Sequence, residues 1–249
     1  MNQRLGMIDW GIGGVSIYKL IKEKHADVPV TYFSDTGVTP YGKMTRTELL
    51  VRLNRVIVFL KSQGVTQLVI GCNAASTAID LLDSAGIEVE GMIESGVAGA
   101  AKLKPKRLGL IGGRRTVVSG VYRKAFAYRG IQVAQRIAQP LSALIESGDT
   151  SSDQLREEAK RILSPLRNCS HILLACTHYP AIIGLLQEFV SSQTVLIDPS
   201  YELVHRIGKI ETDAKGSDAF LTSGDPAAMK TAARNAFGVH IVTARQVVI

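Results

Sequence analysis

The chain has 249 residues, 46% of them hydrophobic, and carries a formal net charge of +7. This length and apolar content allow one large or two small domains with a buried core, whereas no apolar run approaches the roughly 18 residues of a membrane-spanning helix. Three cysteines make no disulfide framework, and the first residues lack the apolar core of a signal peptide, so we expect a cytoplasmic protein with no membrane partner.

Part of the positive charge lies in one cluster, formed by Lys102, Lys104, Lys106, Arg107, Arg114 and Arg115. Such a cluster can attract a small anion or a nucleic acid. Aromatic residues are not interleaved with it, and the sequence contains no helix-turn-helix or zinc-finger pattern. We therefore expect no nucleic-acid partner, and solubility is the simplest explanation of the charge.

The first part of the chain alternates between predicted strands and helices. The strands are 5–8, 30–33, the apolar run 67–71 that leads to Cys72, and 89–93. The helices are 15–23, one capped by Thr45 with an apolar face at Leu49, Leu53, Val56, Ile57 and Leu60, one through about 82, and one from 95 to about 104. A glycine-rich turn at 9–14 lets backbone amides approach a ligand, and a polar loop covers 34–42.

The pattern then restarts. Strands are predicted at 108–113, 132–134, 171–175 and 195–197, with helices at 117–128, 140–146, 153–166, after Pro180 and at 201–207. The tail adds a strand at 220–222, a helix starting at 225–226 and a strand at 240–242. Leu108 follows Leu5 by 103 positions and Cys176 follows Cys72 by 104, which indicates an internal duplication.

Strands that alternate with helices are typical of parallel sheets covered on both faces. We therefore expect an α/β fold of two pseudo-symmetric domains, each with a mostly parallel sheet flanked by helices. Cys72 and Cys176 each follow an apolar strand, and ligands bind beyond the carboxyl ends of such strands. If the two sheet edges face each other, both thiols line one cleft, which is the expected active site.

Two thiols on opposite sides of one carbon can remove a proton from one face and return a proton to the other. This racemisation needs one thiolate and one thiol, and a nearby positive dipole or cation favours the thiolate. His178 is placed to stabilise a thiolate at Cys176, and Asp9 to act on Cys72 or hold a substrate ammonium. Asn73 and Thr177 are candidate donors to the substrate carboxylate.

Each of these residues also has a structural interpretation. A cysteine at the end of an apolar strand is most often packed as a small hydrophobe. Asp9 can cap a helix, His178 and Trp10 can be structural, and Asp35 can build a turn. Cys169 is assigned a structural role. The functional interpretation depends on the matched pair of cysteines rather than on any one residue.

Five motifs together resemble the glutamate racemases of the aspartate/glutamate racemase superfamily. They are DWGIGG (9–14), YFSDT (32–36), PYG (40–42), GCNAAS (71–76) and ACTHYP (175–180). The similarity covers nearly the whole chain in the same order. The resemblance implies two pseudo-symmetric α/β domains, a homodimer, and racemisation of an acidic amino acid with neither pyridoxal phosphate nor metal.

The resemblance also implies roles for individual residues. Cys72 and Cys176 correspond to the two acid/base residues, with Asp9, His178 and Glu146 as auxiliaries. The residues that correspond to substrate contacts are Trp10, Pro40, Tyr41, Gly42, Asn73, Ala74, Thr116 and Thr177. In that family the tail returns to the first domain, so we expect one domain at 1–96 plus 209–249 and the other at 97–208.

The sequence departs from the family pattern at two positions beside the substrate. Trp10 stands where a small serine is common, and Ala74 where threonine is common. One methylene is worth only about 1–3 kcal/mol in discrimination, so an added indole can favour the shorter dicarboxylate. We therefore predict an aspartate racemase, similar to those of microcystin-type peptide pathways. The alternative is a glutamate racemase that supplies peptidoglycan synthesis, with the indole pointing away from the substrate.

Two further hypotheses belong to other classes. A catalytically silent amino-acid-binding protein would retain the cleft, yet both cysteines and His178 are present. A thiol–disulfide enzyme would use Cys72 and Cys176, but the sequence has no Cys-x-x-Cys motif.

Overall fold

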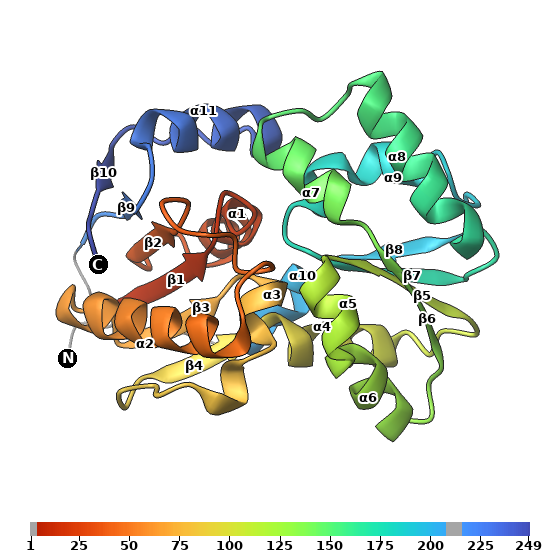
Figure 1. The fold of residues 1–249 in the computed structure, drawn as a ribbon, viewed down its shortest axis with the longest axis horizontal. Coiled ribbons are helices and arrows are strands. Elements are labelled where there is room, and N and C mark those ends of the chain that lie inside the picture. The colour runs from red at the N-terminus through yellow and green to blue at the C-terminus, as the bar shows by residue number, and fades with distance from the viewer. Residues whose placement is uncertain (1–3, 208–215) are drawn as a thin grey trace.

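Two parallel β-sheets form the framework of the computed structural model, which describes residues 4–207 and 216–249 (Figure 1). The first sheet has the strand order β10-β9-β2-β1-β3-β4. Its strands are β1 (Leu5–Asp9), β2 (Val30–Ser34), β3 (Gln67–Ile70), β4 (Glu88–Gly91), β9 (Ala219–Thr222) and β10 (Ala244–Gln246). The second sheet has the order β6-β5-β7-β8, with β5 (Leu108–Gly112), β6 (Val133–Ile137), β7 (His171–Ala175) and β8 (Val195–Ile197).

The internal repeat is visible in the sheet topology. The order β2-β1-β3-β4 corresponds to β6-β5-β7-β8, and every pairing in both sheets is parallel. In this correspondence β1 matches β5 and β3 matches β7. Cys72 and Cys176 therefore follow equivalent strands, and the predicted α/β class with two similar units is confirmed.

Helices cover both faces of each sheet, so the central strands β1, β3, β5 and β7 are almost wholly buried and consist mainly of apolar residues. On the first sheet, α1 (Val15–Lys24), α10 (Pro199–Arg206) and α11 (Pro226–Phe237) pack on one face and α2 (Arg46–Ser62) on the other. One face of the second sheet is covered by α7 (Gln139–Glu146), α8 (Asp153–Leu163) and α9 (Ile183–Gln187). The other face is covered by α4 (Met92–Lys102) and α6 (Val121–Tyr128). Helix α10 contacts α1 and α4, which ties the two units together.

Helix α2 follows directly from its sequence. Its five predicted core residues are all buried, and Thr45 forms a capping box in which its hydroxyl accepts from Glu48 N–H while Glu48 accepts from Thr45 N–H.

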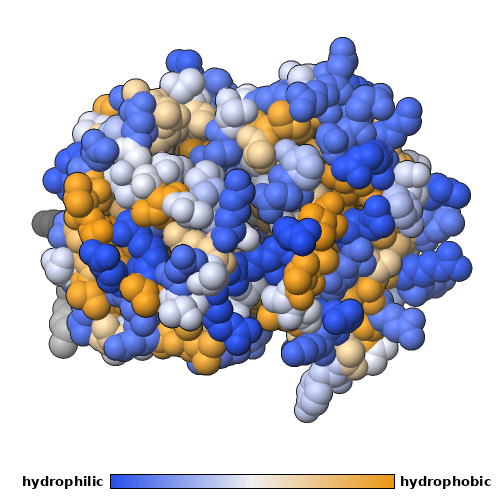
Figure 2. All heavy atoms as spheres, in the orientation of Figure 1, coloured by the Kyte–Doolittle hydropathy of each residue, from blue (hydrophilic) through white to orange (hydrophobic). Residues whose placement is uncertain are grey.

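Within residues 4–207 and 216–249, no helix is both long and apolar enough to cross a bilayer. On the face shown in Figure 2, hydrophilic and hydrophobic residues are interspersed.

Several predicted boundaries are wrong for identifiable reasons. The strand predicted at 89–93 ends at Gly91, because Ser76 Oγ accepts the Met92 N–H and α4 starts there. The helix predicted at 117–128 is split into α5 (Arg114–Ser119) and α6 by Gly120, whose φ is +70°. The helix predicted through 82 is α3 (Asn73–Ser76) followed by a 3-10 turn, Ile79–Leu81.

The chain's final strand is also displaced from its predicted position. It lies at Ala244–Gln246 rather than at 240–242, where the buried Ile241 packs into the core instead of pairing with a strand. Strands β9 and β10 extend the first sheet beyond β2. The domain boundary predicted between residues 208 and 209 lies outside the described residues.

Candidate active site

A cavity of about 520 Å³ is lined by residues at the carboxyl ends of strands from both sheets. It is lined by residues that follow β1, β3 and β7, by α5 and α7, and by the loop after β2. All thirteen residues singled out from the sequence line this one cavity: Asp9, Trp10, Pro40, Tyr41, Gly42, Cys72, Asn73, Ala74, Thr116, Glu146, Cys176, Thr177 and His178. The two sulfurs thus share one cavity rather than occupying separate environments.

Cys72 caps the N-terminus of α3 in an extended conformation and is 9% exposed. Burial raises the pKa of its thiol well above the ordinary value, and the nearby Asp9 carboxylate raises it further. Hydrogen bonds from the backbone N–H groups of Ala75 and Ala74 act in the opposite direction without overcoming burial. Cys72 is therefore a protonated thiol near neutral pH and can donate a proton.

Cys176 lies in a different electrostatic environment, beside an imidazole. His178 Nδ1 is 3.6 Å from Cys176 Sγ, and His178 Nε2 is 2.5 Å from Glu146 Oε2. Burial lowers the pKa of His178, but its hydrogen bonds to Cys176 and Glu146 outweigh burial and place that pKa well above the ordinary value. The raised pKa favours the charged imidazolium, whose two N–H groups would face the Cys176 sulfur and the Glu146 carboxylate.

Asp9 ends β1 and is 1% exposed. Burial raises the pKa of its carboxyl, while the charge of His178 and the hydrogen bond from Thr177 oppose the increase. Thr177 Oγ1 donates to Asp9 Oδ2 at 2.9 Å. The hydroxyl proton of Thr177 is therefore used within the protein, whereas Asn73 Nδ2 has no partner among the described residues and lines the cavity.

The glycine-rich turn after β1 accommodates side chains from the second unit. A Cβ at Gly11 would lie 2.1 Å from Glu146 Oε2, and one at Gly13 would lie 2.8 Å from His178 Nδ1. Ile12 N–H donates to Glu146 Oε2 at 3.0 Å. The amide at Ile12 therefore binds a carboxylate of the protein itself, and the absence of a Cβ at Gly11 is what lets that carboxylate reach His178.

The loop after β2 forms one wall of the cavity. Trp10 Nε1 donates to Val38 O at 3.0 Å, so the indole N–H is satisfied within this wall. Tyr41 Oη donates to the buried Asp35 at 2.7 Å. Arg115, on α5, reaches across from the second unit and donates to the backbone carbonyls of Tyr41, at 3.0 Å, and Met44.

Sequence reasoning missed residues in and around this cavity. Arg115, which does not line it, was assigned only to a basic cluster, although its guanidinium donates to the backbone of the PYG loop. Lys43 lines the cavity directly after that loop, and Gln139 lines it at the start of α7, with Oε1 accepting from Arg114 N–H at 3.1 Å. The position of Lys43 next to the PYG motif was a usable signal, whereas nothing local distinguishes Gln139.

The described residues contain no group of three or more His, Cys, Asp or Glu side chains arranged to hold a metal ion. The fold and cavity define an α/β protein of two similar parallel-sheet units, with a thiol from each unit lining the cleft between them. The sequence pattern of the Asp/Glu/Hydantoin racemase family matches residues 5–207. The chain belongs to this family.

Relatives and solved structures agree with that assignment. The chain is 33% identical over 214 residues to the glutamate racemase of Synechococcus sp. (strain CC9605), covering 84% of this chain and 80% of the relative. It resembles the structure of glutamate racemase from Francisella tularensis in complex with D-glutamate, with a TM-score of 0.89, 24% identity and coverage of 99% and 98%. Glutamate racemase from Thermus thermophilus in complex with beta-chloro-D-alanine gives a TM-score of 0.87 and 26% identity, covering 99% of this chain and 97% of that one.

Proposed function

We propose that this protein is a glutamate racemase in which Cys72 and Cys176 are the two acid/base residues. The observation that carries the proposal is that both thiols line one cavity in opposite electrostatic settings, a buried thiol and a sulfur beside an imidazolium. The names of the compared relatives favour glutamate, the alternative in the sequence analysis, over the aspartate that Trp10 and Ala74 suggested.

The proposed reaction moves one proton on and one proton off the same carbon. The Cys176 thiolate takes the α-proton, so a Cα–H bond breaks and an S–H bond forms, while the electron pair left on Cα delocalises into the carboxylate. The Cys72 thiol then donates its proton to the opposite face and becomes the thiolate. For the reverse direction the two sulfurs exchange roles. Asp9 lies near Cys72 and His178 lies beside Cys176, and each assists proton transfer to and from its neighbouring sulfur.

Substrate choice is tested by measuring initial rates on glutamate and aspartate with purified protein, by circular dichroism or chiral chromatography without added cofactor. We expect kcat/KM for glutamate to exceed that for aspartate by at least about tenfold, the scale on which one methylene is discriminated. Trp10 lines the cavity, and this keeps aspartate as the second candidate. A preference for aspartate that Trp10→Ser reverses would establish that candidate, and no turnover of either amino acid would contradict racemisation itself.

Gly11→Ala tests whether the approach of Glu146 matters for turnover. The new methyl group occupies the position of the Glu146 carboxylate, so the carboxylate moves and His178 loses its partner. We expect kcat to fall by about 10²-fold, the cost of a small misplacement of a catalytic group. The matched control is Gly184→Ala, where a Cβ meets nothing within 4 Å. Equal activity of the two variants would contradict the role of Glu146.

A homodimer and a cytoplasmic location stay predictions. Light scattering of the purified protein measures the first. The binding-protein hypothesis predicts affinity for glutamate without turnover. The thiol–disulfide hypothesis predicts an activity that depends on redox state, whereas racemisation proceeds in the presence of reductant.

A further inference from the structure

The two polar atoms of the Asn73 side-chain amide differ: within the part of the chain that the structure describes, one has a hydrogen-bond partner and the other has none. Its side chain is 3% exposed and lines the cavity, and its Nδ2 has no hydrogen-bond partner among the described residues. A buried amide nitrogen without a partner is costly unless a bound molecule supplies the acceptor. The other amide atom, Oδ1, is bonded: it accepts from Tyr122 Oη at 2.8 Å.

Tyr122 is fully buried and belongs to α6, on the opposite unit from Asn73. Burial raises the pKa of its hydroxyl far above the neutral range, so the group keeps its single proton. The second acceptor within reach is Met92 O, at 3.2 Å. The contact to Asn73 Oδ1 is the shorter of the two and has the length of an ordinary O–H···O hydrogen bond, so we assign the hydroxyl proton to it.

The hydroxyl is held where this contact requires it. A Cβ at Gly96, on α4, would lie 2.7 Å from Tyr122 Oη, so the glycine provides the space for the tyrosine to reach Asn73. Tyr122 itself does not line the cavity. Its effect on a substrate therefore passes through the amide.

We propose that Tyr122 is a positioning residue that fixes the Asn73 side-chain amide with its NH₂ group facing the cavity, where it donates to the substrate carboxylate. With the amide turned over, Oδ1 would face that carboxylate, and two acceptors would oppose each other. This inference rests on the proposed racemase function and adds to it a residue from the second unit that controls substrate binding.

The test is Tyr122→Phe, which removes only the hydroxyl. We expect KM for glutamate to rise about tenfold, the scale of one hydrogen bond, with kcat changed less than about twofold. Adding Tyr122→Phe to Asn73→Ala should leave KM at the Asn73→Ala value, because the hydroxyl then has no amide to orient. Tyr18→Phe is the matched control: it removes a hydroxyl bonded to Asp218, away from the cavity, and should leave KM unchanged.

Gly96→Ala is a second variant, for use if Tyr122→Phe fails to fold. Alanine has the higher helix propensity within α4, and its methyl group displaces the Tyr122 hydroxyl, so KM should rise in the same way. An unchanged KM in either folded variant, or an increase that persists in the Asn73→Ala background, would overturn the inference. Neither outcome bears on whether the wild-type protein racemises glutamate. Absence of wild-type racemisation would instead contradict the proposed function.

Discussion

Replacing Cys72 or Cys176 with alanine is expected to lower kcat for racemisation by at least about 10³-fold in both directions. Each variant lacks the group that serves one face of the α-carbon, and no other described side chain in the cavity carries a thiol. Racemisation needs both faces in every turnover, so the two losses should be similar. The measurement is the initial rate from each enantiomer, followed by circular dichroism.

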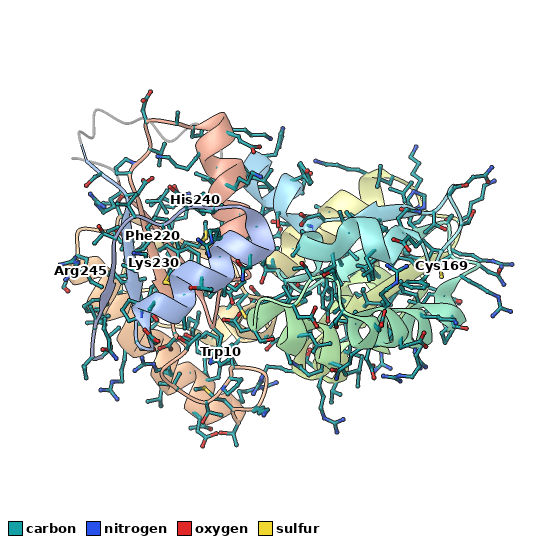
Figure 3. The ribbon with its side chains drawn as sticks, turned by 90° about the horizontal axis from the view of Figure 1, so that it is seen from above. Trp10, Cys169, Phe220, Lys230, His240 and Arg245 are labelled. Atoms are coloured by element: carbon teal, nitrogen blue, oxygen red, sulfur yellow. The ribbon has the colours of Figure 1, made fainter. Side chains whose placement is uncertain are left out.

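Cys169→Ala is the matched control for this experiment. Cys169 precedes β7, does not line the cavity, and in Figure 3 lies at the outer end of the second unit, far from Trp10. This variant should keep near-normal turnover. Near-normal turnover in Cys72→Ala or Cys176→Ala would remove that cysteine from the proposed mechanism.

His178→Asn is expected to lower kcat by about 10²-fold at pH 7. Asparagine keeps a hydrogen-bonding group beside Cys176 but carries no positive charge, so it cannot stabilise a negative charge that develops on that sulfur. Initial rates of the variant and of wild type at pH 7 test this expectation, and an unchanged kcat would contradict it.

The same residue makes a prediction for stability. Its pKa is raised in the folded state by Cys176 and Glu146 despite the opposing effect of burial, so its stabilisation is fully present below pH 6.5, the ordinary value, and is lost as the pH rises through the raised value. His178→Asn should therefore lower the free energy of unfolding in urea most at pH 6, and the difference from wild type should shrink as the pH rises through the raised value. His171→Asn, at the start of β7 and outside the cavity, is the comparison: burial lowers the pKa of His171, so this substitution should show the opposite dependence on pH. A destabilisation independent of pH would contradict a charged His178.

Local sequence patterns predicted much of the fold because they report burial. The apolar runs before Cys72 and Cys176 are strands covered on both faces, and the 103- and 104-residue offsets reflect equivalent positions in two sheets of the same strand order. The errors fall where a contact distant in sequence decides the outcome. The hydrogen bond from Met92 N–H to Ser76 fixes the start of α4. Ile241 is apolar because it packs into the core, and its apolar character was interpreted as a strand.

The site divides in the same way. The thirteen candidate residues line one cavity, because most of them lie in motifs at the carboxyl ends of β1, β3 and β7 or in the loop after β2. Residues that act through another residue were not found. The contacts of Arg115 with Tyr41 and of Tyr122 with Asn73 join positions 74 and 49 residues apart, and no local pattern encodes such pairs.

The most direct test of two sulfurs acting on one α-carbon is the racemisation of L-glutamate in D₂O, stopped early and analysed by chiral separation and mass spectrometry. We predict that the D-glutamate formed carries deuterium at Cα while the recovered L-glutamate retains protium, because one sulfur takes the proton and the other, equilibrated with solvent, returns a deuteron to the opposite face. D-glutamate that retains the original protium, or deuterium appearing at once in both enantiomers, would mean that a single group serves both faces and would contradict this account.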